Sequence, residues 1–182
     1  MKKLVYPDQR SKKFILVPFC LMCQAFQARG IVRLGFTSTM TPIIEELLKY
    51  DVNIIQMPCP ESLLGGYEKG LQREPKGYTA YQTPEFLLIC EKIARGTVEM
   101  IEGIIRNGFE VVAIMGIEYS PSCSIKFQYT NKGNIRQSGH FIEALGREMD
   151  GRNIKIPFIG INRRNVKGAI KQIQEILEPK FF

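Results

Sequence analysis

The sequence lacks the motifs by which many enzymes bind nucleotide cofactors. It contains neither Gly-x-Gly-x-x-Gly nor a Gly-Lys-Ser/Thr loop, and it has no second cluster of cysteines that would relay electrons. It also has no apolar segment of the roughly 20 residues that a membrane span needs. We therefore expect no membrane partner and a chemistry that requires neither an organic cofactor nor a reductant.

Features of a dedicated nucleic-acid reader are missing as well. No run of five or more like charges occurs, and no RNA-binding motif of aromatic and glycine residues is present. The net charge of +7 favours anionic partners through its long-range field. A nucleic-acid partner is therefore possible but not favoured, and a small molecule is the expected ligand.

The five cysteines show no pairing pattern of a small secreted framework, which predicts a reduced, cytoplasmic protein. The 182 residues fit a single domain, residues 1–182, large enough to bury its own core. Residues 1–12 are a candidate flexible N-terminal segment. The sequence does not indicate an oligomeric state.

Apolar runs alternate with helical patterns along the chain. Helix starts are expected where Thr-Pro pairs place threonine at the cap and proline at the first helical position, at Thr41-Pro42 and Thr83-Pro84. Short buried strands are expected at 14–17, 52–57, 110–116 and 156–161. This rhythm predicts an α/β fold with a mostly parallel sheet of four to five strands and helices on both faces. Residues 65–81 are the longest expected irregular piece and a candidate lid.

Three cysteines, Cys20, Cys59 and Cys123, each follow an expected strand and lie beside turn-forming residues. The carboxyl ends of parallel strands meet at one edge of a sheet, where ligands bind. Thiolates are the usual ligands of iron–sulfur clusters and of zinc. The pattern therefore predicts a metal or iron–sulfur site with an open position.

The other two cysteines and the only histidine have different contexts. Cys23 lies three residues after Cys20 and could be a fourth ligand, an alternative ligand or a bystander. Cys90 falls on an apolar helical stripe and is expected in the core. His140 stands at an expected helix start and is interpreted as a surface or cap residue.

A carboxylate and a serine are the candidate catalytic residues. Glu61 lies two residues after Cys59, so its carboxylate would project from the same turn and could accept a proton from water. Ser120 and Ser122 flank Pro121 before Cys123, where a hydroxyl could orient the substrate or water. Ser120 is the preferred candidate, although either serine could instead bond to its own backbone.

The ordered set Cys20, Cys59-Pro60-Glu61 with Gly65-Gly66, and Ser120-Pro121-Ser122-Cys123 resembles the thiouracil desulfidase family over residues 14–178. The resemblance implies a [4Fe-4S] cluster held by Cys20, Cys59 and Cys123, with no protein ligand on the fourth iron. It also implies Glu61 and Ser120 as catalytic residues. The implied activity is hydrolytic removal of sulfur from a thiolated pyrimidine, with thiouracil or thiouridine as the type of substrate and sulfide as product.

Two alternatives use the same cysteines. One is a zinc protein, in which four thiolates would make a closed structural site and three plus water an open catalytic one. The other is a carrier that binds sulfide or a cluster and passes it on without turnover. The sequence does not distinguish a free base from a nucleoside, a nucleotide or a base in RNA.

Overall fold

The computed structural model describes residues 7–130 and 133–178. Its main sheet is parallel, with the strand order β2-β1-β3-β6. The strands are β1 (Lys13–Pro18), β2 (Asn53–Met57), β3 (Glu110–Ile117) and β6 (Phe158–Ile161). The expected α/β fold with a mostly parallel sheet is therefore confirmed. Of the expected flexible segment at 1–12, residues 1–6 lie outside the described residues.

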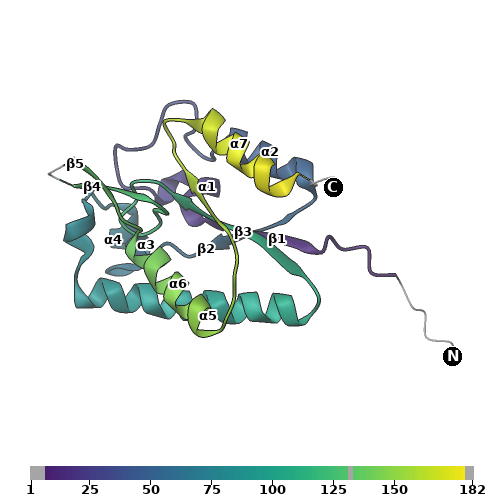
Figure 1. The fold of residues 1–182 in the computed structure, drawn as a ribbon. Helices are drawn as coiled ribbons and strands as arrows, with labels where there is room; N and C mark the ends of the chain where they lie inside the picture. Colours follow the sequence, from purple (N-terminus) through teal and green to yellow (C-terminus); the bar gives the residue numbers. More distant parts are fainter. Residues whose placement is uncertain (1–6, 131–132, 179–182) are drawn as a thin grey trace.

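Helices cover both faces of this sheet (Figure 1). One face carries α5 (Pro84–Arg106) and α6 (His140–Gly151), and the other carries α2 (Thr41–Leu47) and α7 (Val166–Leu177). Side chains of a strand alternate between the two faces. In β1, Leu16 therefore packs with the α5 and α6 core, whereas Ile15 and Val17 pack with the α2 and α7 core. Among the described residues, no helix is long and apolar enough to cross a bilayer.

The expected cap chemistry is confirmed at one of the two Thr-Pro starts, and Asn165 caps α7 in the same way. Thr83 Oγ1 accepts a hydrogen bond from the Phe86 amide at 3.3 Å, and Asn165 Oδ1 accepts one from the Gly168 amide at 3.0 Å. The prediction for Thr41 is wrong, because α2 begins at Thr41 itself. Its hydroxyl donates backward to the Thr39 carbonyl at 3.4 Å, so it caps no helical amide.

One local prediction is wrong because of tertiary packing, and one pair of strands was not predicted. The stretch 65–81 is not irregular, since it contains α4 (Gly66–Leu71) and the 3₁₀ turn η3 (Tyr78–Tyr81). Gly70 has a low helix propensity, but a Cβ there would lie 2.1 Å from the Ser62 carbonyl, so its bare Cα permits the close approach to α3 (Pro60–Leu63). The antiparallel hairpin of β4 (Phe127–Thr130) and β5 (Gly133–Arg136) was not predicted.

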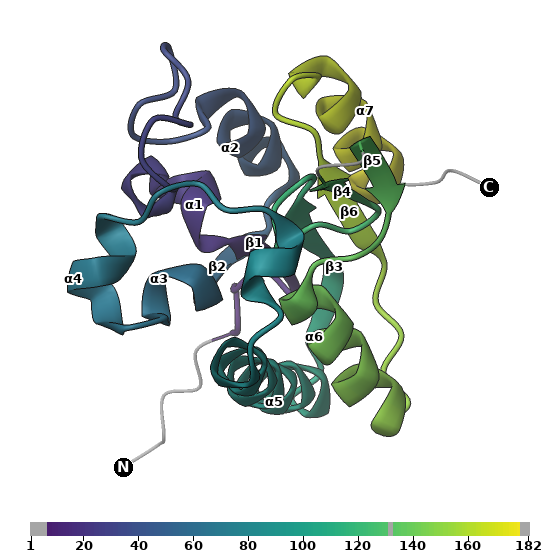
Figure 2. The same cartoon turned by 90° about the vertical axis from the view of Figure 1, so that its left-hand side faces the viewer.

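The short elements gather at the end of the sheet where β1, β2 and β3 terminate (Figures 1 and 2). They are α1 (Phe19–Met22), the 3₁₀ turn η1 (Gln24–Phe26), α3, α4 and the β4–β5 hairpin. A further 3₁₀ turn, η2 (Leu48–Tyr50), extends α2. Three strand ends and their connecting loops thus surround a single region.

Candidate functional site

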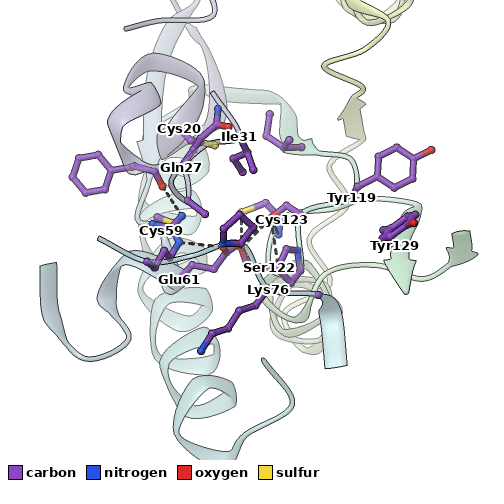
Figure 3. Close-up of a pocket in the computed structure, with 18 of the residues that line it drawn as sticks. Cys20, Gln27, Ile31, Cys59, Glu61, Lys76, Tyr119, Ser122, Cys123 and Tyr129 are labelled. Atoms are coloured by element: carbon purple, nitrogen blue, oxygen red, sulfur yellow. Dashed lines mark hydrogen bonds and ion pairs between the residues drawn. The ribbon is translucent and has the colours of Figure 1, made fainter. Parts of the chain in front are cut away.

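Three cysteines line one cavity of about 350 Å³ at this end of the sheet (Figure 3). Cys20 lies in the first turn of α1, directly after β1. Cys59 precedes α3 and follows β2 by two residues. Cys123 lies in the loop after β3. Three segments that are far apart in the sequence therefore contribute one thiol each to the same cavity.

The three cysteines line the cavity together with Glu61 and the two serines. Within residues 7–130 and 133–178, no three histidine, cysteine, aspartate or glutamate side chains group closely enough to hold one metal ion. A single zinc ion would need each sulfur about 2.3 Å away. A four-iron cluster is larger and binds each thiolate on a different iron. The three sulfur donors that line one cavity are a ligand type that suits both iron–sulfur clusters and zinc.

The thiols are poor free nucleophiles in this setting. Burial raises the pKa of Cys20 to about 12, and it also raises the pKa of Cys59 and of Cys123. Reactive cysteines in enzymes instead have lowered pKa values, because the thiolate is the nucleophile. A bound metal deprotonates a coordinating thiol outright. The cysteine environment therefore fits metal ligation and does not fit nucleophilic catalysis by a free thiolate.

Glu61, in α3, lines the same cavity and has an organised set of donors. Its Oε1 accepts hydrogen bonds from Ser122 Oγ at 2.6 Å and from Ser120 Oγ at 3.2 Å. Its Oε2 lies 3.4 Å from Arg73 Nε, and both side chains of this ion pair are only 11% exposed. The carboxylate is therefore held in one orientation inside the cavity.

The two serines have different surroundings. Ser120 Oγ accepts hydrogen bonds from the amides of Ser122 and Cys123, at 3.3 and 3.1 Å, so it also braces its own loop. Ser122 is fully buried, makes the shorter bond to Glu61 and lies 3.4 Å from Cys123 Sγ. The structure thus brings both candidate serines, the preferred Ser120 and Ser122, into contact with Glu61.

Neighbouring segments fix the loop that carries these serines and Cys123. The first amides of α6 are satisfied by this loop, since the His140 amide donates to the Pro121 carbonyl at 3.0 Å and the Phe141 amide to the Ser122 carbonyl at 3.1 Å. A Cβ at Gly139 would lie 2.3 Å from the Ser122 carbonyl. Close packing against α6 therefore requires glycine at this position.

No local pattern in the sequence predicts a role for Arg73, yet its guanidinium contacts several segments that surround the cavity. It donates hydrogen bonds to the Gly70 carbonyl at 2.8 Å, to Ser62 Oγ at 3.1 Å and to the Phe26 carbonyl at 2.5 Å. It also lies 4.0 Å from Cys59 Sγ. The sequence signal that could have found it is a lone arginine in the stretch after Gly65-Gly66, but its partners are visible only in the fold.

The remaining candidates lie outside the cavity lining. Cys23 is partly buried at the end of α1 and is not among the residues that line the cavity. Cys90, in α5, is 1% exposed and packs in the core, which confirms its prediction. His140 is 5% exposed and stacks on Tyr78 with ring centroids 4.1 Å apart, so the prediction of a surface position is wrong.

Two known proteins are similar to this chain, one in sequence and one among solved structures. No family model matches the sequence. An uncharacterized protein of Methanocaldococcus jannaschii is 25% identical over 171 residues, which cover 93% of this chain and 99% of that protein. Among solved structures, the [4Fe-4S]-dependent thiouracil desulfidase TudS aligns over 90% of this chain and 99% of its own, with 17% identity and a TM-score of 0.47. The chain is thus similar in sequence to the Methanocaldococcus jannaschii protein along nearly its whole length.

Proposed function

We propose that this protein holds a [4Fe-4S] cluster on Cys20, Cys59 and Cys123 and removes sulfur by hydrolysis from a small thiolated pyrimidine of the thiouracil or thiouridine type. The observation that carries the proposal is the convergence of three cysteine thiols, two of them buried, and one oriented carboxylate, Glu61, on one cavity. Three protein ligands leave one iron of such a cluster open. When bound, the cluster would supply a soft Lewis acid for the sulfur atom.

Glu61 is proposed as the general base. Ser120 and Ser122 donate to its Oε1, and Arg73 pairs with its Oε2, so the carboxylate is oriented before the substrate arrives. A water molecule loses a proton to this carboxylate, and its oxygen bonds to the carbon that carries sulfur. The carbon–sulfur bond then breaks, and the sulfur leaves as hydrogen sulfide with the proton that Glu61 returns and the second proton of the water. One water is consumed, and no atom changes its oxidation state.

The cavity walls are suited to a flat ring. Phe26, Ile31 and Pro121 give apolar surface, and Tyr119 and Tyr129 lie at one side of the cavity (Figure 3). Such walls bury a pyrimidine, while a few polar groups set its orientation. The serine hydroxyls supply hydrogen bonds for the ring or the water, in addition to holding Glu61.

Anaerobic purification or reconstitution, followed by iron and acid-labile sulfide analysis, tests the cluster. Thiouracil and thiouridine in heavy-oxygen water then test the reaction, with one labelled oxygen in the base and one free sulfide expected per turnover. A strict requirement for dithionite or ATP would contradict hydrolysis. A colourless protein that contains zinc would favour the zinc alternative, and tightly bound sulfide without any base product would favour the carrier.

A further inference from the structure

The β4–β5 hairpin contributes one buried polar side chain to residues 120–123, the serine loop. Side chains of β4 alternate between two faces, so Phe127 and Tyr129 are exposed, whereas Gln128 between them is buried. Gln128 is 0% exposed, and its Nε2 donates a hydrogen bond of 2.8 Å to the Ser120 carbonyl. The hairpin is therefore joined to the serine loop by a side chain that solvent does not reach.

The backbone just before the serine loop is strained. Tyr119 has a φ of 68°, in the left-handed region that is unfavourable for a residue with a Cβ. The Tyr119 amide donates to the Phe127 carbonyl at 3.0 Å, and the Ser120 amide donates to the Ile117 carbonyl at 3.1 Å. A strained residue persists only where surrounding contacts hold it. The Ser120 carbonyl, which Gln128 holds, is the next acceptor along this backbone.

The start of the hairpin is itself held by a buried carboxylate, Glu118. This side chain belongs to a residue that is 8% exposed, and its Oε2 accepts three hydrogen bonds. The donors are the Ser124 hydroxyl at 2.9 Å and the amides of Lys126 and Phe127 at 3.1 and 3.0 Å. Gln128 therefore extends toward the serine loop from a strand whose first residue is fixed in place.

Gln128 makes fewer hydrogen bonds than its carboxamide allows. Its Oε1 is buried, and no donor among the described residues bonds to it. A buried acceptor without a partner is unfavourable for folding. The Ser120 carbonyl also accepts a hydrogen bond from the Ser124 amide at 3.2 Å, so it keeps a partner when the glutamine is replaced. The fold thus gains little from Gln128, whereas the serine loop gains a fixed orientation.

We propose that Gln128 is a positioning residue that orients the serine loop toward Glu61. Ser120 Oγ lies 3.2 Å from Glu61 Oε1 and also accepts hydrogen bonds from the amides of Ser122 and Cys123. Ser122 Oγ lies 2.6 Å from the same carboxylate oxygen. A brace on the Ser120 carbonyl therefore fixes both hydroxyls that orient Glu61. The effect on turnover rests on the proposed function, whereas the effect on the loop does not.

Gln128→Met tests the proposal, because methionine has a similar size and lacks both the donor and the unpartnered acceptor. We expect kcat for thiouracil to fall about fivefold, the equivalent of one neutral hydrogen bond, with KM and iron content unchanged. Hydrogen-exchange mass spectrometry should show exchange at least about fivefold faster for the Ser122 and Cys123 amides, which donate to Ser120 Oγ. Tm should stay within about 3 °C of the wild-type value.

Thr97→Val is the matched control, since Thr97 is 5% exposed and lies in α5, outside the hairpin and the serine loop. It also replaces a buried polar group by an apolar one, and it should change neither kcat nor exchange in the serine loop. Unchanged kcat of Gln128→Met in an active enzyme, or loop exchange no faster than in Thr97→Val, would overturn the positioning role. Faster exchange throughout the chain with a lower Tm would also overturn it, because Gln128 would then be a purely structural residue.

Failure of the proposed function gives a different result. A wild-type protein that assembles no cluster and leaves thiouracil unconverted would refute the desulfidase. Exchange of the Ser122 and Cys123 amides in Gln128→Met would then decide the positioning role by itself, because this measurement needs neither cluster nor substrate.

Discussion

The two hollows at the carboxyl end of the sheet are built in different ways. Glu61 lies in α3 after β2, its partners Ser120 and Ser122 lie in the loop after β3, and its partner Arg73 follows α4. Hydrogen bonds and an ion pair with these partners orient the buried carboxylate. The neighbouring hollow of about 580 Å³, which Arg33, Arg163 and Arg164 line, takes Arg33 from the loop before α2 and Arg164 from the loop after β6, and both are exposed. Buried polar networks lose much when one member is removed, whereas exposed charges act more weakly and are screened by salt. Substitutions should therefore have large effects in the cysteine cavity and graded effects beside it.

The largest effect is expected for the cysteines that line the cavity. Cys59→Ser and Cys123→Ser should each remove most of the bound iron, since two remaining ligands leave a cluster open to loss. Cys90→Ala is the matched control, because Cys90 is equally buried but lies in the core. Iron and sulfide analysis after anaerobic reconstitution measures the outcome. Iron retained in Cys59→Ser but lost in Cys90→Ala would refute the ligand assignment.

Cys23 gives a second contrast with the cysteines that line the cavity. It lies outside the cavity lining, so Cys23→Ser should keep both cluster and activity. An electronic absorption spectrum of the variant tests whether the cluster is kept, and a turnover assay tests whether the activity is kept. Loss of the cluster in this variant would instead indicate a closed site with four cysteines.

Glu61→Gln is expected to lower turnover by roughly two to four orders of magnitude, the range for a lost general base. Glutamine keeps the shape of the side chain but cannot accept the proton. The iron content should stay unchanged, which separates catalysis from assembly. Near-normal turnover would show that Glu61 has only a structural role.

Arg73→Met should destabilise the fold by about 3 kcal/mol, because it breaks a buried ion pair and leaves the Glu61 carboxylate without its cationic partner. Arg147→Met is the control, since the Arg147 and Glu91 side chains are 66% and 55% exposed and such a pair contributes about 1 kcal/mol or less. Urea unfolding of both variants measures the difference. Equal losses of stability would mean that Arg73 does not organise the cavity.

The smallest effects are expected for the two serines, and they should differ in kind. Ser122→Ala removes the shorter hydrogen bond to Glu61 and should lower kcat by about tenfold, the equivalent of one hydrogen bond to a charged group. Ser120→Ala also removes the acceptor of two loop amides, so it should lower Tm as well as kcat. Thermal unfolding and steady-state kinetics, measured side by side, distinguish the two. Equal changes of Tm and kcat in the two variants would contradict separate roles for Ser120 and Ser122.

Local signals account for what could be predicted from the sequence. The four strands and α5 carry apolar periodicity or a Thr-Pro start, and these signals lie within a few residues. The burial of Cys90 follows from its helical stripe in the same way. The cysteine turns were recognisable because strand ends and turn residues are adjacent in the sequence.

What the sequence by itself determined is the parallel α/β layout and the edge of the sheet at which three cysteines and Glu61 lie. Only the tertiary structure decided the contacts made by the arginines. Arg73 reaches a carbonyl 47 residues away, and Arg163 reaches Gln27 across 136 residues. The same holds for α4, whose Gly70 packs against α3, and for His140, which is buried under Tyr78. Such partners depend on how layers pack, and no pattern of neighbouring residues encodes that packing.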